Sequence, residues 1–244
     1  MEKWGKPPPP SPPPPRPSGG SADSVQPPTP KVGFAKAFTN LAGRKLRELR
    51  GLKWDGGVDR RGRTVPPASD RARLAEANRR AAKELARRIE RQTGRRPKES
   101  TIRRAAREDR TPRGADQARL DRQARVDAAG GVKQFADKAG VPAGGVPGWI
   151  ERGESMGVGR LRITTNVKGD LYSGGSTPYE KTIDAVLYLE PPAADEFRAA
   201  AADGDFDALA QMLGPVIDAQ YVWTGETETP RQFIVTEINS LTIE

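Results

Sequence analysis

The 244-residue sequence contains no cysteine and no histidine. Their absence excludes disulfide bonds, thiol nucleophiles, histidine general bases and the usual zinc ligands. Hydrolases that depend on a catalytic Ser–His or Cys–His pair are therefore excluded. We expect a protein that has no metal or cofactor of its own.

Long apolar runs are missing as well. No segment approaches the roughly 18 apolar residues that a membrane-spanning helix needs, and no apolar stretch of the kind found in signal peptides follows Met1 to Lys6. The sequence therefore predicts a cytoplasmic protein with no membrane partner.

The first thirty residues are rich in proline. From residue 7 they read PPPPSPPPPRPSGGSADSVQPPTP, with almost no apolar side chain to bury. Such a composition is typical of extended polyproline and flexible coil. We expect a disordered tail over residues 1–30.

Charge is distributed very unevenly along the chain. Residues 31–130 carry 29 Lys and Arg against 13 Asp and Glu, whereas residues 131–244 carry 9 against 17. A basic block fused to an acidic one is typical of a polyanion-binding face, most often for nucleic acid. The sequence thus predicts DNA as a partner and association with the nucleoid. A merely solvated, charged helix is the alternative.

Two amphipathic helices are expected at the start of the basic block. Apolar residues from Phe34 to Leu49 recur at spacings of three and four. A second helix can be capped by Ser69 or Asp70 and ended by Gly94. Its apolar stripe, expected to face inward, consists of Leu74, Ala77, Ala81, Leu85 and Ile89.

Residues 85–107, LARRIERQTGRRPKESTIRRAAR, have the layout of a helix-turn-helix. Gly94 would take the turn, Pro97 would open the second helix, and Ile102 would anchor that helix to the core. The expected DNA contacts, suited to phosphates and guanine edges, are Arg95, Arg96, Lys98, Thr101, Arg103, Arg104, Arg107 and Arg110. An ordinary helical hairpin remains the alternative.

A second helix-turn-helix pattern lies further along the chain. Its spacing positions are Ala136, Gly140, Val146 and Trp149. However, prolines and glycines crowd its second half, and each costs a helix interior about 1 to 3 kcal/mol. We therefore expect a helix over 131–139 followed by a loop over 140–156, with Trp149 as a packing residue or an exposed anchor.

The C-terminal part, residues 157–244, alternates between strand and helix patterns. Helices are expected from Pro191 and Pro192 through Phe197 and over 205–217, and strands over 160–168, 182–189, 219–224 and 231–243. This order predicts an antiparallel sheet with two helices on one face. The fold class is α+β, divided into a tail (1–30), a basic helical DNA-binding region (31–139), a loop (140–156) and an α+β domain (157–244).

Several segments carry a family resemblance. They are FAKAFTNLAG from residue 34, the 85–107 segment with the following EDRTPRGADQARLDRQARV, GGSTPYEKTIDAVLYLEPP, FRAAAADGDFDALAQMLGPV, QYVWTGE and FIVTEINSLTIE. From residue 34 to its end the chain resembles the telomere terminal proteins of linear actinomycete chromosomes and plasmids. The proline tail, the segment after Gly140 and the longer turn depart from the family pattern.

The resemblance implies a protein primer, not an enzyme. In that family a DNA polymerase joins the first nucleotide to a threonine hydroxyl, and the matching residue here is Thr177. Ser176, Tyr172 and Tyr179 are the fallback nucleophiles. The implied partners are telomeric DNA, as duplex or single-stranded overhang, a DNA polymerase that needs Mg²⁺, and a telomere-associated protein.

The position of Thr177 suits that role on physical grounds. It follows two glycines and precedes a proline, and such residues favour an exposed, adaptable loop. Three other interpretations stay open: an ordinary hairpin loop at this position, a helix-turn-helix repressor of a mobile element that dimerises through its C-terminal part, and a non-covalent telomere-associated scaffold that uses its proline tail for recruitment.

Overall fold

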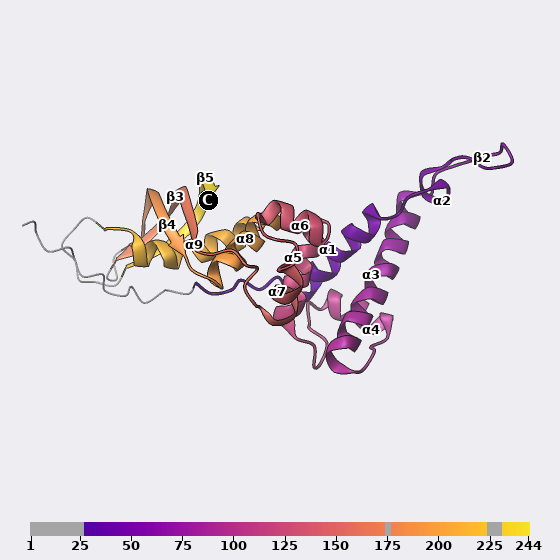
Figure 1. Ribbon diagram of the computed structural model, residues 1–244, viewed down its shortest axis with the longest axis horizontal. Helices are drawn as coiled ribbons and strands as arrows, with labels where there is room; N and C mark the ends of the chain where they lie inside the picture. The colour runs from indigo at the N-terminus through magenta and orange to yellow at the C-terminus, as the bar shows by residue number, and fades with distance from the viewer. Residues whose placement is uncertain (1–26, 174–176, 224–230) are drawn as a thin grey trace, which may run out of the picture.

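The computed structural model describes residues 27–173, 177–223 and 231–244. The molecule is elongated, with a small sheet at one end, a helical middle, and at the other end the long helix α3 with a two-stranded hairpin that projects beyond it (Figure 1). The described residues form nine helices, a three-stranded antiparallel sheet and a two-stranded hairpin. The predicted α+β class is confirmed. Within this part of the chain no helix is both long and apolar enough to cross a membrane.

The elements have the following bounds. The helices are α1 (Phe34–Arg47), α2 (Leu52–Asp55), α3 (Asp70–Thr93), α4 (Glu99–Arg107), α5 (Gln117–Ala129), α6 (Val132–Ala139), α7 (Val146–Arg152), α8 (Ala193–Asp203) and α9 (Phe206–Gln220). The strands are β1 (Gly57–Val58), β2 (Thr64–Val65), β3 (Leu161–Ser173), β4 (Tyr179–Leu189) and β5 (Arg231–Ile243).

Helix α1 packs between α3 and α5, and α4 closes the end of this bundle. The Ser69 side chain caps α3 by accepting the Ala72 N–H at 3.3 Å. Four residues of the predicted α3 stripe are buried, but Leu74 is 52% exposed, so that part of the prediction is wrong. The core cluster that covers Ala77 does not extend to Leu74, and the first turns of α3 therefore stand clear of the bundle.

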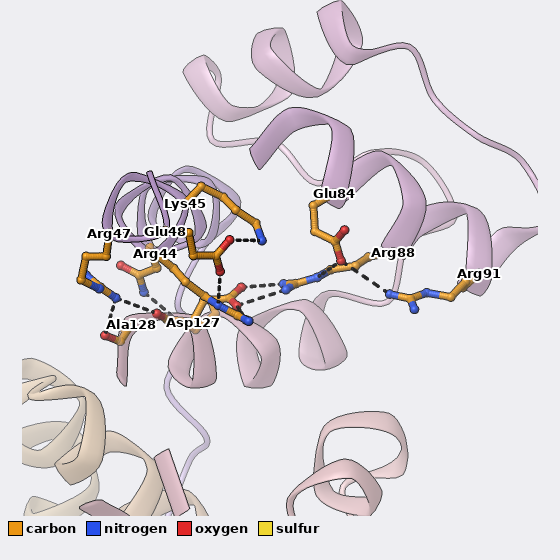
Figure 2. Close-up of polar contacts among 11 residues, drawn as sticks. Arg44, Lys45, Arg47, Glu48, Glu84, Arg88, Arg91, Asp127 and Ala128 are labelled. Atoms are coloured by element: carbon orange, nitrogen blue, oxygen red, sulfur yellow. Dashed lines mark hydrogen bonds and ion pairs between the residues drawn. The ribbon is translucent and has the colours of Figure 1, made fainter. Parts of the chain in front are cut away.

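A buried charge network joins α1, α3 and α5 (Figure 2). Asp127, whose side chain is 1% exposed, accepts Arg88 Nη1 at 2.6 Å and Arg44 Nη1 at 2.9 Å. Arg47 reaches the Asp127 carbonyl at 3.3 Å. These arginines belong to the basic block, and their ion pairs hold helices together. Part of the block's positive charge is therefore structural.

We expect Asp127→Ala to lower the free energy of unfolding by about 3 kcal/mol, because it leaves two arginines, one of them buried, without their counter-charge. Urea denaturation of the full chain measures this change. Asp137→Ala is the matched control, since Asp137 is exposed on α6 and makes no ion pair with a described residue; its effect should stay within about 0.5 kcal/mol. Equal effects of the two substitutions would show that the network contributes nothing.

A second buried arginine connects the bundle to the C-terminal part. Arg125 on α5 is 1% exposed, and its Nη1 lies 3.1 Å from Asp203 and 3.4 Å from Asp205. Burial raises the pKa of the Asp203 carboxyl to about 6, although the charge of Arg125 lowers it. The contact pairs the basic block with acidic residues that lie outside it.

The predicted tail is too long at its C-terminal end. Pro27 and Pro30 are buried against the body of the protein, and the Pro30 carbonyl accepts Arg125 Nη2 at 3.3 Å. Residues 27–30 are therefore ordered by a partner far along the chain, which composition does not reveal. Residues 1–26 lie outside the described part.

The loop predicted over 140–156 contains helix α7, so that expectation is wrong. Pro147 lies in the first turn of α7, where its missing N–H costs no hydrogen bond. Trp149 is 1% exposed and stacks on Phe135 of α6 with ring centroids 5.4 Å apart. Its burial confirms the interpretation of Trp149 as a packing residue, and of the glycines in this segment only Gly148 lies inside α7.

The sheet has the order β4-β3-β5, and all neighbours are antiparallel. Alternate residues of β3, from Leu161 to Leu171, face a core made with α8 and α9. The strand predicted over 219–224 is wrong: α9 continues through Gln220, residues 221–223 are not in a strand, and Thr224 lies outside the described part. The Gln220 amide bonds both the N–H (2.8 Å) and the C=O (2.7 Å) of Tyr188, and thereby occupies the edge of β4.

Candidate nucleic-acid interface

Helices α3 and α4 form the two helices that were expected for the helix-turn-helix over residues 85–107. Gly94 ends α3 in a left-handed conformation, with φ of 71° and its N–H bonded to the Glu90 carbonyl at 2.8 Å. Helix α4 begins at Glu99, two residues later than the predicted start at Pro97, because residues 95–98 complete the turn. Ile102 is fully buried in the core cluster that contains Leu85 and Ile89. This apolar anchor fixes which face of α4 points outward.

The outward face of α4 is strongly basic. With 3.6 residues per turn, Ser100, Arg103, Arg104 and Arg107 lie on the side opposite Ile102. We call these four residues the α4 stripe. All eight side chains that the sequence predicted as DNA contacts are exposed. The structure thus gathers them on the turn, on α4 and on the residues just after it.

Three of these arginines have nearby carboxylates. Arg104 lies 2.8 Å from Glu108 and Arg103 lies 3.6 Å from Glu99. The hydrogen bond between Arg104 and Glu108 lowers the pKa of Glu108 and raises that of Arg104. Exposed pairs of this kind contribute little to stability, so a guanidinium can exchange its carboxylate for a phosphate at small cost.

The third pair joins Arg96 to Glu90 at 3.8 Å. The remaining four cations make no ion pair within the described residues: Arg95, Lys98, Arg107 and Arg110. The surface around α4 therefore carries more cations than its own carboxylates neutralise. That excess favours contact with a polyanion.

Asp109 fixes the C-terminal end of α4, and this role was not predicted from the sequence. It adopts a left-handed conformation with φ of 45°, which aspartate tolerates better than most residues. Its carboxylate accepts the Ala35 N–H at 2.8 Å and so caps α1, whose N-cap residue Gly33 has no side chain for that purpose. The partners lie 74 residues apart, so no local pattern shows the contact.

Helices α6 and α7 form the second helix-turn-helix pattern, contrary to the prediction that only α6 would be helical. Gly140 takes the left-handed turn with φ of 64°, and Val146 and Trp149 are buried as that pattern requires. Helix α7 nevertheless offers few side chains that could bind DNA. Its single cation, Arg152, is paired with Glu154, and its Glu151 pairs with Arg119.

The expected priming residue lies at the other end of the molecule. Thr177 is exposed just before β4, at the turn of the β3–β4 hairpin. Among the fallback nucleophiles, Tyr172 is 38% and Tyr179 53% exposed, while Ser176 lies outside the described residues. In Figure 1 this sheet lies at one end of the molecule, and α4 lies far from it, on the other side of the helical middle.

Aromatic and cationic side chains gather at the hairpin-turn end of the sheet. Lys181 Nζ lies 5.1 Å from the ring of Trp223 and 5.8 Å from that of Tyr221, and the Arg231 guanidinium lies 5.8 Å from Trp223. We call these four residues the aromatic–cation cluster. Strand register pairs Ser173 with Arg231 and so places the cluster beside the turn that contains Thr177. This cluster was not predicted from the sequence, because Tyr221 and Trp223 fall in the segment 219–224 that was expected to be a strand.

No protein-family model matches the chain, and no curated protein or solved structure matches it either. The resemblance to telomere terminal proteins therefore stays a prediction from the sequence. Among the described residues no group of three or more acidic side chains is placed to hold a metal ion. The residues that bear on function lie in two regions, around α4 and at the turn of the β3–β4 hairpin.

Proposed function

We propose that this protein binds duplex DNA through α4 and acts as a terminal protein, with Thr177 as the hydroxyl that receives the first nucleotide. The observation that carries the proposal is the α4 stripe: three arginines on one face of a short helix whose opposite face is anchored by the buried Ile102. The priming role rests on the family resemblance and on the exposure of Thr177.

DNA binding follows from the shape and charge of this end. An α-helix fits the major groove of B-DNA, where arginine can bond guanine O6 and N7, while neighbouring cations hold phosphates. The stripe supplies the arginines for the groove. Arg95, Lys98 and Arg110, at the two ends of α4, are placed to bind the flanking phosphates.

The priming step is a phosphoryl transfer. The Thr177 Oγ1 attacks the α-phosphorus of a deoxynucleoside triphosphate, a Thr–O–P bond forms, pyrophosphate leaves, and the hydroxyl proton passes to a base or water in the polymerase. The partner polymerase supplies the Mg²⁺ that stabilises the charge of the transition state. This chain needs only to present an accessible hydroxyl, so its lack of histidine and cysteine is no obstacle.

Two features support the combination of roles. Separation of α4 from the hairpin turn (Figure 1) allows the protein to hold duplex while the hydroxyl enters another protein. The aromatic–cation cluster beside the turn combines half-buried aromatic rings with positive charge, which is the chemistry that single-stranded nucleic acid and nucleotides favour.

A salt titration tests the DNA-binding part. The full chain should bind a random-sequence 30-bp duplex, and log Kd should rise with log salt concentration with a slope of about 4 or more, because each phosphate contact releases about 0.9 counterion. Fluorescence anisotropy between 50 and 300 mM salt measures the slope. Absence of binding at 50 mM salt, or affinity indifferent to salt, would refute the proposal.

A further inference from the structure

Between α2 and α3 the chain projects from the body of the protein, although the residues on either side of this segment are in contact with each other. The Ala68 N–H donates to the Trp54 carbonyl at 3.2 Å, so the two ends of the segment already touch. Residues 56–67 nevertheless leave the body, form the β1–β2 hairpin and return. We call this segment the basic arm. In Figure 1 it projects from the end of α3 opposite α4, away from the sheet.

The base of the arm is rigidly attached. Trp54 is 8% exposed and packs with Leu49 and Ala77, and Arg73 of α3 bonds the Trp54 carbonyl at 3.1 Å. Gly56 lies at the base of the arm, where the outgoing and returning chain segments are close together. Its φ is 73°, and a Cβ there would lie 2.8 Å from the Pro67 nitrogen. The arm therefore leaves the body in a fixed direction.

The tip of the arm is also ordered. Asp59 accepts the N–H groups of Arg61 (2.8 Å) and Arg63 (2.9 Å), and its other oxygen accepts Arg63 Nε at 2.9 Å. Arg63 is therefore occupied by its bonds to Asp59 in the turn. Arg60 and Arg61 are exposed and make no ion pair with a described residue. The arm has no core of its own, and Val58 is 66% exposed.

We propose that the basic arm is a second DNA contact, in which Arg60 and Arg61 bind phosphates of the duplex more than one helical turn away from the α4 contact. Helix α3 separates α4 from the base of the arm: its 24 residues span about 36 Å at 1.5 Å per residue, and the arm projects beyond that end (Figure 1). One turn of B-DNA spans 34–36 Å.

A duplex-length experiment tests the arm, and it rests on the proposed DNA binding by α4. The full chain and its Arg60→Ala/Arg61→Ala variant are titrated with a random-sequence 30-bp duplex and with a hairpin-capped 10-bp duplex, which at 3.4 Å per pair is about 34 Å long. The matched control is Lys133→Ala/Lys138→Ala, two exposed lysines of α6.

On the 30-bp duplex the arm variant should bind about tenfold more weakly, and its salt slope should be lower by about 2, one unit for each lost phosphate contact. On the 10-bp duplex the arm variant should have the same affinity as the unchanged protein. When α4 is bound to this short duplex, the arm lies beyond the end of the DNA. Equal affinity and slope on both lengths, or the same loss on both, would overturn the arm contact.

The outcomes separate this inference from the proposed function. If the unchanged protein binds neither duplex, then DNA binding itself fails and the arm contact fails with it. If α4-dependent binding persists but the arm variant shows no length-dependent loss, then only the arm contact fails.

Discussion

Thr177→Val should abolish covalent labelling of the protein by a replicative DNA polymerase. With a telomeric template, Mg²⁺ and one labelled deoxynucleotide, the unchanged protein should acquire label that survives denaturation in detergent. Valine keeps the β-branched shape but removes the nucleophilic oxygen, so labelling should fall at least a hundredfold while folding and DNA affinity persist. Because Thr177 is exposed and precedes β4, no core contact is lost.

Two variants give this test its controls. Thr177→Ser should retain part of the labelling, because a hydroxyl remains at the same place. Ser176→Ala should label like the unchanged protein. Full labelling of Thr177→Val would move the linkage to Ser176, Tyr172 or Tyr179. No labelling of the unchanged protein, by a polymerase active on another terminal protein, would favour the repressor interpretation.

Simultaneous replacement of Arg103, Arg104 and Arg107 by alanine should weaken duplex binding roughly a thousandfold at 100 mM salt, since each lost arginine contact costs about 1 to 3 kcal/mol. Alanine favours helix, so α4 should keep its fold. Anisotropy titrations measure the affinity, and circular dichroism checks the helix content.

The control for this triple variant is Lys133→Ala/Lys138→Ala on α6, which should change affinity less than threefold. The reverse ranking would transfer the DNA contact to the α6–α7 pair. That result would revive the second pattern, whose helices the structure does form. Our reason for preferring α4 is chemical, because α7 offers a single, already paired cation.

Local features were predictable from the sequence. The start and end of α3 follow from a serine cap and a left-handed glycine, and both act within one turn of the helix. Burial of Ile102 follows from helical periodicity alone. The exposed arginines of α4 could be predicted for the same reason, because a helix with one apolar face must turn its charges outward.

Long-range pairing was not predictable. Asp127 lies 39 residues from Arg88 and 83 from Arg44, and composition alone counts these arginines only as part of the basic block. Helix α7 forms where Trp149 stacks on Phe135 of α6, and it contains one glycine, Gly148, because the neighbouring glycines lie outside it. Residues 219–224 resemble a strand because Tyr221 and Trp223 favour sheets, yet α9 continues through Gln220, whose side chain bonds Tyr188 of β4.

The measurement that tests the central claim most directly is DNA cleavage from a probe on α4. Because the chain has no cysteine, Ser100→Cys gives a single attachment point for iron–EDTA at the N-terminal end of the α4 stripe, and Lys138→Cys gives the matched point on α6. Radicals released at Cys-linked iron cut only nearby DNA. With a random-sequence 30-bp duplex at low salt, the position-100 probe should cut strongly and the position-138 probe should cut near background. Equal cutting from both positions, or stronger cutting from position 138, would contradict DNA binding through α4.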